Sequence, residues 1–358
     1  MSKLKVYVYA ICKNESKFVE NYVKSMNEAD GIYVLDTGST DDTVEKLKKL
    51  QVNVKQEIIK PFRFDIARNK SLEMVPMDAD ICVCTDFDEI FTPGWREKLE
   101  KTWLKENPTR VEYLYNWSFD EKGNPATTFY MSKIHKRDAY VWHHPVHEVL
   151  KCIKGTDKSV IVEEMVLNHH QDVKKKRSSY LPLLELSVKE EPEDDRNMHY
   201  LGREYMYYER YNEAIDTLLK HLNLKTSTWK DERAASMRFI ARSYLGLKRP
   251  IEAKMWYELA IKEAPYLREA YVELAGAYYT EENYEKAYHY LKEASKIKEK
   301  PVTYINEDFC WNVYFYDMLS VTAFYVGKKD EAIENVKKAL EMDKENERLQ
   351  KNLELMSE

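Results

Sequence analysis

The sequence predicts a protein of two parts: an α/β domain with a mostly parallel, Rossmann-like sheet, followed by an all-α domain of helical repeats. Between residues 5 and 170, short apolar runs alternate with amphipathic segments, as expected for strands separated by single helices. From about residue 197 the pattern is helical only. Related copies of it begin at residues 234 and 268, which are 34 residues apart.

The first part predicts strands and helices in strict alternation. Its β-branched runs indicate strands, and its amphipathic segments indicate helices. Asp41 or Asp42 is placed to cap the second helix. Ligands of such sheets bind beyond the carboxyl ends of the strands, so polar residues at these ends are candidates for a site. The expected strands are 6–12, 32–35, 52–58 and 81–84, and the expected helices are 18–26, 43–50 and 67–74.

The second part has the spacing of tetratricopeptide repeats, in which paired helices recur about every 34 residues. Small residues stand where neighbouring helices approach closely, and large residues fill the gaps. The repeats form either a stabilising appendage or a concave surface for an extended peptide or a partner protein. An exposed repeat edge could also pair with a second copy and give a homodimer. The small positions include Gly202, Ala241, Ala253, Ala260, Ala275, Ala287 and Ala294.

A charged segment joins the two parts. We expect the α/β domain at 1–171, a charged helical linker at 172–196 and the repeat domain at 197–358. The linker contains a basic run at 174–177, which we interpret as a solvated helix end. Apolar residues farther along predict a connecting helix that begins near Pro182.

Composition argues against several classes of function. The 358 residues carry a formal charge of -6, which argues against nucleic acid as the partner. No apolar run approaches the ~20 residues of a membrane span. The five cysteines are odd in number and scattered, which is unlike a disulfide framework and fits a cytoplasmic location. Charges follow the apolar run at 6–12, so we interpret that run as a strand and not as a signal peptide.

An acidic cluster follows the fourth strand. Asp86 and Asp88 are one residue apart, so their side chains point to the same side and can share a divalent ion. Such an ion could neutralise a diphosphate. Asp36 ends the second strand, where it could accept a hydrogen bond from a nucleotide or form an Asx turn. An acidic loop that binds no metal is the alternative.

A second polar region spans residues 142–148. Three histidines and Glu148 fall within six residues of one another, which could indicate zinc. However, no cysteine pair accompanies them, and a structural zinc site needs four well-spaced ligands. Trp142 beside the histidines is either a core residue or a stacking wall for a ligand.

Four segments, in order along the first part, resemble family 2 glycosyltransferases of the GT-A fold. The segments are 10–15 (AICKNE), 35–43 (LDTGSTDDT), 65–69 (DIARN) and 86–88 (DFD). The resemblance covers roughly residues 4–170. In its combination with the repeats, the whole chain is similar to bacterial glycosyltransferases that act on peptides or proteins.

This resemblance implies a nucleotide-sugar site and a metal. Uracil is the favoured base, hence UDP. Asp88 would be the main ligand of Mn²⁺ or Mg²⁺, and Asp86 would share the ion or contact the ribose. His169, rather than His170, would supply a further metal ligand. The residues that would bind the nucleotide sugar are Ile11, Lys13, Glu15, Asp36, Arg68 and Asp86.

The resemblance also implies an activity. We expect a cytoplasmic, metal-dependent, inverting glycosyltransferase that moves a hexose or N-acetylhexosamine from a UDP-sugar to a protein or peptide side chain. Glu148 would be the catalytic base, with His147 as the rival candidate, and the repeats would bind the acceptor. One alternative acceptor is a glycan or a lipid-linked saccharide. The other alternative is a catalytically inactive repeat scaffold.

Overall fold

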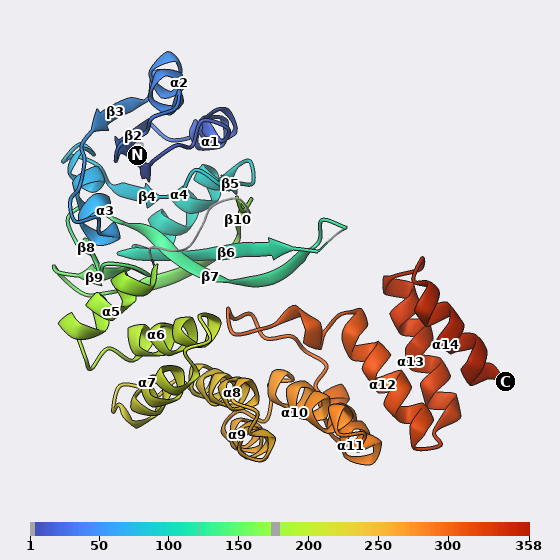
Figure 1. Cartoon of the computed structure of the whole chain (residues 1–358). Helices are drawn as coiled ribbons and strands as arrows, with labels where there is room; N and C mark the ends of the chain where they lie inside the picture. Colours follow the sequence, from blue (N-terminus) through green and yellow to red (C-terminus); the bar gives the residue numbers. More distant parts are fainter. Residues whose placement is uncertain (1–3, 121, 173–179) are drawn as a thin grey trace. The chain divides into compact units, whose positions relative to one another are not determined.

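The computed structural model describes residues 4–120, 122–172 and 180–358. The chain divides into two compact units, Met1–Ser187 and Val188–Glu358, which we call unit 1 and unit 2. Unit 1 contains the sheet and unit 2 is helical (Figure 1). The predicted basic run at 174–177 lies outside the described residues. In the part of the chain that is described, none of the helices combines the length and the apolar character needed to cross a bilayer.

Unit 1 is built on an eight-stranded sheet, whose order among the described residues is β3-β2-β1-β4-β7-β6-β10-β5. The strands from β3 to β4 are parallel, as are β6 and β10, whereas β7 and β5 run antiparallel to their neighbours. A separate two-stranded sheet holds β8 and β9. The predicted α/β class with its mostly parallel sheet is therefore confirmed. The strands are β1 (Val6–Cys12), β2 (Gly31–Asp36), β3 (Asn53–Gln56), β4 (Ile81–Cys84), β5 (Glu89–Phe91), β6 (Arg110–Phe119), β7 (Pro125–Lys136), β8 (Tyr140–His143), β9 (Val149–Cys152) and β10 (Ser159–His169).

The two faces of the sheet bury different elements, because side chains alternate along each strand. In β1, Val8 and Ala10 belong to a core that also contains residues of α1, α2 and α4. Tyr9 belongs to a second core, which it shares with Leu72 of α3 and with Trp142 of the β8–β9 hairpin. Helix α3 and this hairpin therefore cover the face opposite α1. These helices are α1 (Val19–Met26), α2 (Thr43–Lys49), α3 (Phe64–Glu73) and α4 (Trp95–Glu106).

The expected elements of the first part occur where predicted, and their ends differ by a few residues. The largest shift is at α3, which begins at Phe64 instead of Ala67. The Phe64 amide donates to the Pro145 carbonyl (2.9 Å), and such a tertiary contact leaves no trace in the local pattern. The strands β5–β10 and the helix α4 have no bounds among the predicted elements. The long β6–β7 hairpin mixes polar and apolar residues with several register shifts, which obscures its period of two.

Unit 2 consists of helix pairs that follow one another in the order of the chain (Figure 1). The predicted tetratricopeptide pattern is confirmed, because the alanines at its small positions, from Ala241 to Ala294, are fully buried. The connecting helix α5 (Tyr180–Glu190) contains the boundary between the units. The helices that follow it are α6 (Asp195–Tyr207), α7 (Tyr211–Asn223), α8 (Lys230–Gly246), α9 (Pro250–Glu263), α10 (Glu269–Thr280), α11 (Tyr284–Lys296), α12 (Val313–Tyr325), α13 (Lys329–Met342) and α14 (Glu347–Ser357).

Gly202 shows how tightly the helices of one pair pack. A methyl group built at Gly202 in α6 would lie 2.5 Å from Cγ of Leu218 in α7, and the Leu218 side chain is fully buried. At Gly276 in α10 the nearest atom would be the Tyr314 hydroxyl at 3.8 Å, which is ordinary contact. Two helical glycines thus differ in whether a side chain fits.

We predict that Gly202→Ala lowers the free energy of unfolding by about 1–3 kcal/mol, because the added methyl overpacks against Leu218. Gly276→Ala is the matched control, and we expect it to be neutral or to stabilise by about 0.5–1 kcal/mol, because alanine is the better helix former. Urea unfolding followed by the helical circular dichroism signal measures both. Equal effects at the two positions would contradict the packing described here.

Candidate active site

An aromatic side chain fixes the loop that follows β4. Phe87 is 2% exposed and stacks on Tyr22 of α1, with ring centroids 4.3 Å apart. The Tyr22 hydroxyl also hydrogen-bonds Oγ1 of Thr85 (3.0 Å). Because Phe87 is buried in the core, the flanking Asp86 and Asp88 are turned away from it, at the carboxyl edge of the sheet.

Arg68 of α3 joins this loop to the segment that precedes β9. Its Nη2 donates to both carboxylate oxygens of Asp86 (2.8 and 3.1 Å), and its Nε donates to Oε1 of Glu148. Its Nη1 donates to Sγ of Cys84 (3.2 Å). The guanidinium is almost fully buried and lies 5.2 Å from the ring centroid of Trp142. Arg68 therefore brings together two residues that the sequence analysis assigned to donor binding and to catalysis.

Helix α3 and the β8–β9 hairpin are tied together on both sides of Arg68. The Asn69 amide group donates to the Trp142 carbonyl and accepts from the Trp142 backbone amide, each at 2.8 Å. Phe64, at the start of the helix, donates to Pro145 in the connecting loop. These contacts fix the helix against the loop, so that Glu148 lies within reach of Arg68.

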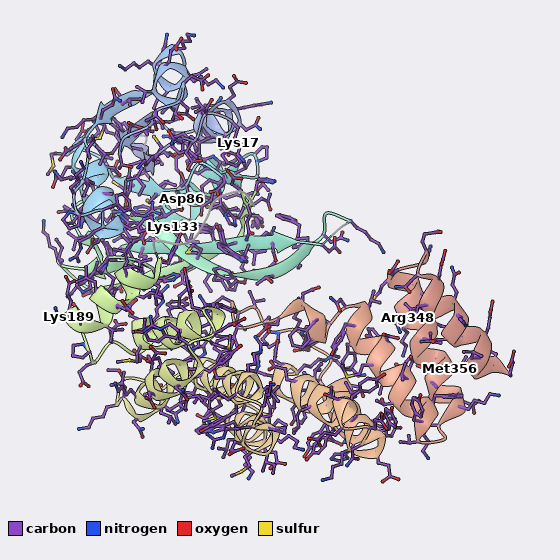
Figure 2. All side chains as sticks on the ribbon, in the orientation of Figure 1. Lys17, Asp86, Lys133, Lys189, Arg348 and Met356 are labelled. Atoms are coloured by element: carbon purple, nitrogen blue, oxygen red, sulfur yellow. The ribbon has the colours of Figure 1, made fainter. Side chains whose placement is uncertain are left out.

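Lys133 of β7 adds a second cation to the same carboxylate. The antiparallel register pairs Val83 of β4 with Ile134, so Lys133 comes beside the last residue of β4. Its Nζ donates to Oδ2 of Asp86 (2.9 Å) and to Oε1 of Glu89 (2.8 Å). Figure 2 shows Lys133 and Asp86 next to each other inside unit 1.

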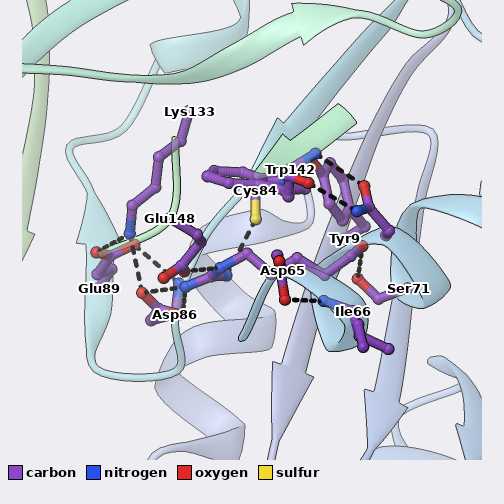
Figure 3. Close-up of polar contacts among 12 residues, drawn as sticks. Tyr9, Asp65, Ile66, Ser71, Cys84, Asp86, Glu89, Lys133, Trp142 and Glu148 are labelled. Atoms are coloured by element: carbon purple, nitrogen blue, oxygen red, sulfur yellow. Dashed lines mark hydrogen bonds and ion pairs between the residues drawn. The ribbon is translucent and has the colours of Figure 1, made fainter. Parts of the chain in front are cut away.

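These contacts form one chain of alternating charge, which we call the charge chain: Glu89, Lys133, Asp86, Arg68 and Glu148. Figure 3 labels its four members other than Arg68. Burial alone would raise the pKa of Asp86, but the two cations outweigh it and hold that pKa well below its usual range. Burial would lower the pKa of Lys133, yet the two carboxylates raise it well above its usual range. Asp86 and Lys133 are therefore both charged at neutral pH.

Asp88 stands apart from the charge chain and faces His169. The β5–β10 register places His169 opposite Glu89, and the His169 Nε2 lies 3.4 Å from Oδ2 of Asp88. The other ring nitrogen, Nδ1, donates to the Trp117 carbonyl (3.1 Å), which leaves Nε2 facing the carboxylate. Two atoms that bind one ion at ~2.1 Å lie about 3.0–3.4 Å apart, so this pair fits a divalent cation.

The sharing of one ion by both aspartates stays a prediction, and the two carboxylates differ in their surroundings. Both Asp86 oxygens are hydrogen-bonded to cationic side chains, whereas the Asp88 carboxylate faces an imidazole. Four carboxylates and two permanent cations lie together here, which favours a divalent ion by charge alone. Asp88 and His169 are the residues that can hold such an ion.

The predicted nucleotide residues lie side by side at the ends of β1 and β2. Cys12 pairs with Asp36 in the parallel register, which brings Ile11, Lys13 and Glu15 to the same edge. Asp36 is fully buried, and its Oδ1 accepts from the backbone amides of Gly38 (3.2 Å) and Ser39 (3.1 Å). The Asx turn that the sequence left as an alternative is thus formed. Contacts of these residues with a nucleotide stay a prediction.

The histidine-rich segment before β9 does not converge on a metal within unit 1. Among the described residues of unit 1, no three His, Cys, Asp or Glu side chains bring their ligand atoms together. His144 and His147 have positive φ angles of 83° and 51°, which turn the chain sharply before Glu148. The His147 ring lies 5.8 Å from that of Tyr180, while Glu148 bonds Arg68. The two candidate bases therefore have different surroundings.

Trp142 belongs to the core and does not form an exposed wall. It is 4% exposed, and its Nε1 donates to the Tyr9 hydroxyl (2.7 Å). Tyr9 in turn lies 2.7 Å from Nε2 of His135, whose Nδ1 lies 2.9 Å from the Lys136 carbonyl. A neutral His135 with its proton on Nδ1 satisfies this order, with the Tyr9 hydroxyl donating to Nε2. Burial, opposed by the backbone hydrogen bond, lowers the pKa of His135 to about 4, which agrees.

Unit 2 contains polar groups of its own. A cavity of about 840 Å³ is lined by aromatic and charged side chains, among them Arg242, Glu273, Tyr279, Phe309 and Tyr314. Of these lining residues, Arg242 pairs with Glu273 (2.8 Å). The cavity therefore offers both stacking surfaces and charged hydrogen-bonding groups.

A mixed group of ligand-type residues also occurs in unit 2. Asp195, His221 and Glu232 bring ligand atoms within 4.8 Å of one another. Nε2 of His221 lies 3.3 Å from Glu232 and 3.1 Å from the Ser227 hydroxyl, while the Tyr304 hydroxyl donates to Glu232 (2.5 Å). Protein groups thus satisfy His221 and Glu232, so this group joins helices without needing an ion.

Sequence comparison agrees with this division of the chain. Residues 7–163 match the family described as glycosyl transferase family 2, and residues 269–301 and 313–346 match the tetratricopeptide repeat. The N-terminal part therefore carries a family 2 glycosyltransferase domain, and the C-terminal part carries tetratricopeptide repeats. No curated protein matches the chain.

Several solved structures are similar to part of the chain. A MamA fragment from Desulfovibrio magneticus is 18% identical, and the match covers 48% of this chain and 87% of the MamA chain with a TM-score of 0.36. PilF of Pseudomonas aeruginosa is 17% identical, with coverages of 48% and 70% and a TM-score of 0.39. A thermophilic tetratricopeptide-repeat protein of Thermus thermophilus is 18% identical, with coverages of 50% and 89% and a TM-score of 0.36.

Lys133 is the site residue that the sequence analysis missed. In the printed sequence it is one of two lysines in a strand of mixed polarity, which is typical of a solvated surface. Its burial follows from the pairing of β7 with β4, which joins segments about 50 residues apart. No local pattern carries that information.

We predict that unit 1 loses stability as the pH falls from about 6.5 towards 4, because an unfolded chain would protonate His135 and the folded unit does not. Below pH 6.5 this loss is about 1.4 kcal/mol per pH unit. Urea unfolding of the wild type and of His135→Gln at several pH values measures it, since glutamine cannot take up the proton. A variant with the same pH dependence as the wild type would contradict this assignment.

Proposed function

We propose that the chain is a metal-dependent, inverting glycosyltransferase that moves a sugar from a UDP-sugar to a protein or peptide side chain. The observation that carries the proposal is the meeting of five predicted site residues at one edge of the sheet of unit 1. Arg68, Asp86 and Glu148 are joined in the charge chain, and Asp88 faces His169 beside it. Such an edge is where α/β sheets bind their ligands.

Asp88 and His169 would hold the divalent ion, either Mn²⁺ or Mg²⁺. Mn²⁺ accepts both a carboxylate oxygen and an imidazole nitrogen, which suits this pair. Bound there, the ion would supply Lewis-acid stabilisation of the negative charge on a departing diphosphate. The hydrogen bond from His169 Nδ1 to the Trp117 carbonyl orients the ring towards Asp88.

Glu148 is the proposed catalytic base. In an inverting transfer the acceptor hydroxyl or thiol attacks the anomeric carbon and loses its proton to the base, while the bond from that carbon to the diphosphate oxygen breaks and leaves its electron pair on the diphosphate. Glu148 is ion-paired with Arg68, so its carboxylate is held in place beside a fixed cation. His147 is the rival, and its ring lies against that of Tyr180.

The repeats of unit 2 are the proposed acceptor site. The cavity lined by Tyr279, Phe309 and Tyr314 offers aromatic surface for side chains of a peptide, and Arg242 and Glu273 offer charged partners. Because both units belong to one chain, an acceptor bound by unit 2 reaches the site of unit 1 at a raised effective concentration.

We predict that the protein hydrolyses a UDP-sugar slowly in Mn²⁺ and transfers the sugar when a suitable peptide is supplied. A panel of UDP-sugars and a peptide library, analysed by mass spectrometry, would show a mass gain of one hexose or N-acetylhexosamine. Asp88→Asn should abolish both reactions. Absence of turnover with every donor would favour the inactive scaffold, whereas transfer to glycans alone would favour the saccharide alternative.

We predict that Glu148→Gln lowers kcat for transfer by about 10²–10⁴, because general base catalysis supplies that much. The affinity for UDP should stay within about threefold, since glutamine can still accept from Arg68. The exposed Glu163→Gln is the matched control and should leave kcat unchanged. A loss confined to His147→Gln would transfer the role of base to His147.

A further inference from the structure

We propose that Lys133 is a diphosphate-binding residue of the donor site. Its ammonium contacts the distal phosphate of the departing nucleoside diphosphate, which is the phosphate farther from the nucleoside. The inference rests on the proposed function, because it needs a nucleoside diphosphate as leaving group. It concerns a residue that neither the motifs nor the family match singles out. Its basis is the two carboxylate contacts that Lys133 makes and the third N–H donor of its ammonium, which no described residue accepts.

Lys133 is placed where a diphosphate beside the aspartates would lie. Its side chain is 12% exposed, and its Nζ lies 2.9 Å from Asp86, whose own side chain is 33% exposed. Asp88 and His169 lie next to this group, because His169 pairs with Glu89 in the β5–β10 register and Glu89 accepts from Lys133. A diphosphate next to an ion at Asp88 would therefore lie within reach of the ammonium.

The ammonium has one donor to spare. A lysine carries three N–H groups, and two of them are used by Asp86 and Glu89. Among the described residues, nothing accepts the third. A largely buried cation with an unused donor, beside a carboxylate that is one-third exposed, is suited to a ligand that brings an anionic oxygen.

The carboxylates do not need Lys133 for their hydrogen bonds. Both oxygens of Asp86 accept from Arg68. Glu89 accepts from the Tyr115 hydroxyl (2.9 Å) and from the backbone amide of Asp86 (2.8 Å). What Lys133 supplies to these carboxylates is positive charge, which also neutralises the buried Glu89.

The negative charge of the diphosphate is larger than one divalent ion can neutralise, so Lys133 would neutralise part of it. A free nucleoside diphosphate carries about three negative charges near neutral pH, so a single divalent ion leaves part of the charge unpaired. Lys133 would supply a fixed positive charge where negative charge builds up as the bond to the sugar breaks. Arg68 already divides its donors among three groups, because Glu148, Cys84 and Asp86 each accept from one of its nitrogens.

The test compares two nucleotides in two variants. Lys133→Met alone would leave Glu89 charged and buried. The comparison is therefore between Glu89→Gln and the double variant Glu89→Gln/Lys133→Met. Calorimetry in saturating Mn²⁺ measures the affinity for UDP and for UMP, which lacks the distal phosphate. Unfolding temperatures confirm that each variant folds, and Lys133→Gln replaces Lys133→Met if the latter does not. Lys101→Met, on the exposed surface of α4, is the control for loss of a lysine.

We expect Glu89→Gln/Lys133→Met to bind UDP at least tenfold more weakly than Glu89→Gln, because a hydrogen bond between two charged groups is lost. UMP affinity should change less than twofold, and Lys133→Arg should restore most of the UDP affinity. Equal losses for UDP and UMP, or no loss for either, would overturn the inference. Failure of the wild type to bind UDP at all would instead overturn the proposed function.

Discussion

The ion pairs of Asp86 with Arg68 and Lys133 are the interaction on which the rest of the site depends. They join the loop after β4, the helix α3 and the strand β7, which are far apart in the sequence. Buried charges are costly to desolvate, and removal of one partner leaves another uncompensated. The pairs therefore specify geometry more than they add stability. With Asp86 held by cations, Asp88 is the aspartate left to face His169.

The same interaction links the two halves of the proposed chemistry. Arg68 contacts the carboxylate of the donor side and the proposed base at once. Any ligand that moves Asp86 or Arg68 therefore alters the surroundings of Glu148 through a direct contact. The hydrogen bonds between Asn69 and Trp142 hold Arg68 within reach of Glu148, because they fix the helix α3 against the β8–β9 hairpin.

Much of the fold could be predicted because its signals are local. The first strands are apolar runs between single helices, and the repeats show their 34-residue period through small residues such as Ala253 and Ala287. The pairing of Asp88 with His169 was implied by the family resemblance, and the β5–β10 register brings the two side chains together. Lys133 could not, because its burial depends on a pairing between distant strands. The turn formed by Asp36 was one of two possibilities, and the amides of Gly38 and Ser39 that donate to its carboxylate show that it forms.

The most direct test of this account is the structure of the protein bound to UDP and Mn²⁺. The account predicts the ion at ~2.1 Å from Asp88 and from Nε2 of His169, with Asp86 still bonded to Arg68. An ion held jointly by Asp86 and Asp88 with His169 turned away, or a nucleotide bound elsewhere than at the carboxyl ends of β1 and β4, would contradict it.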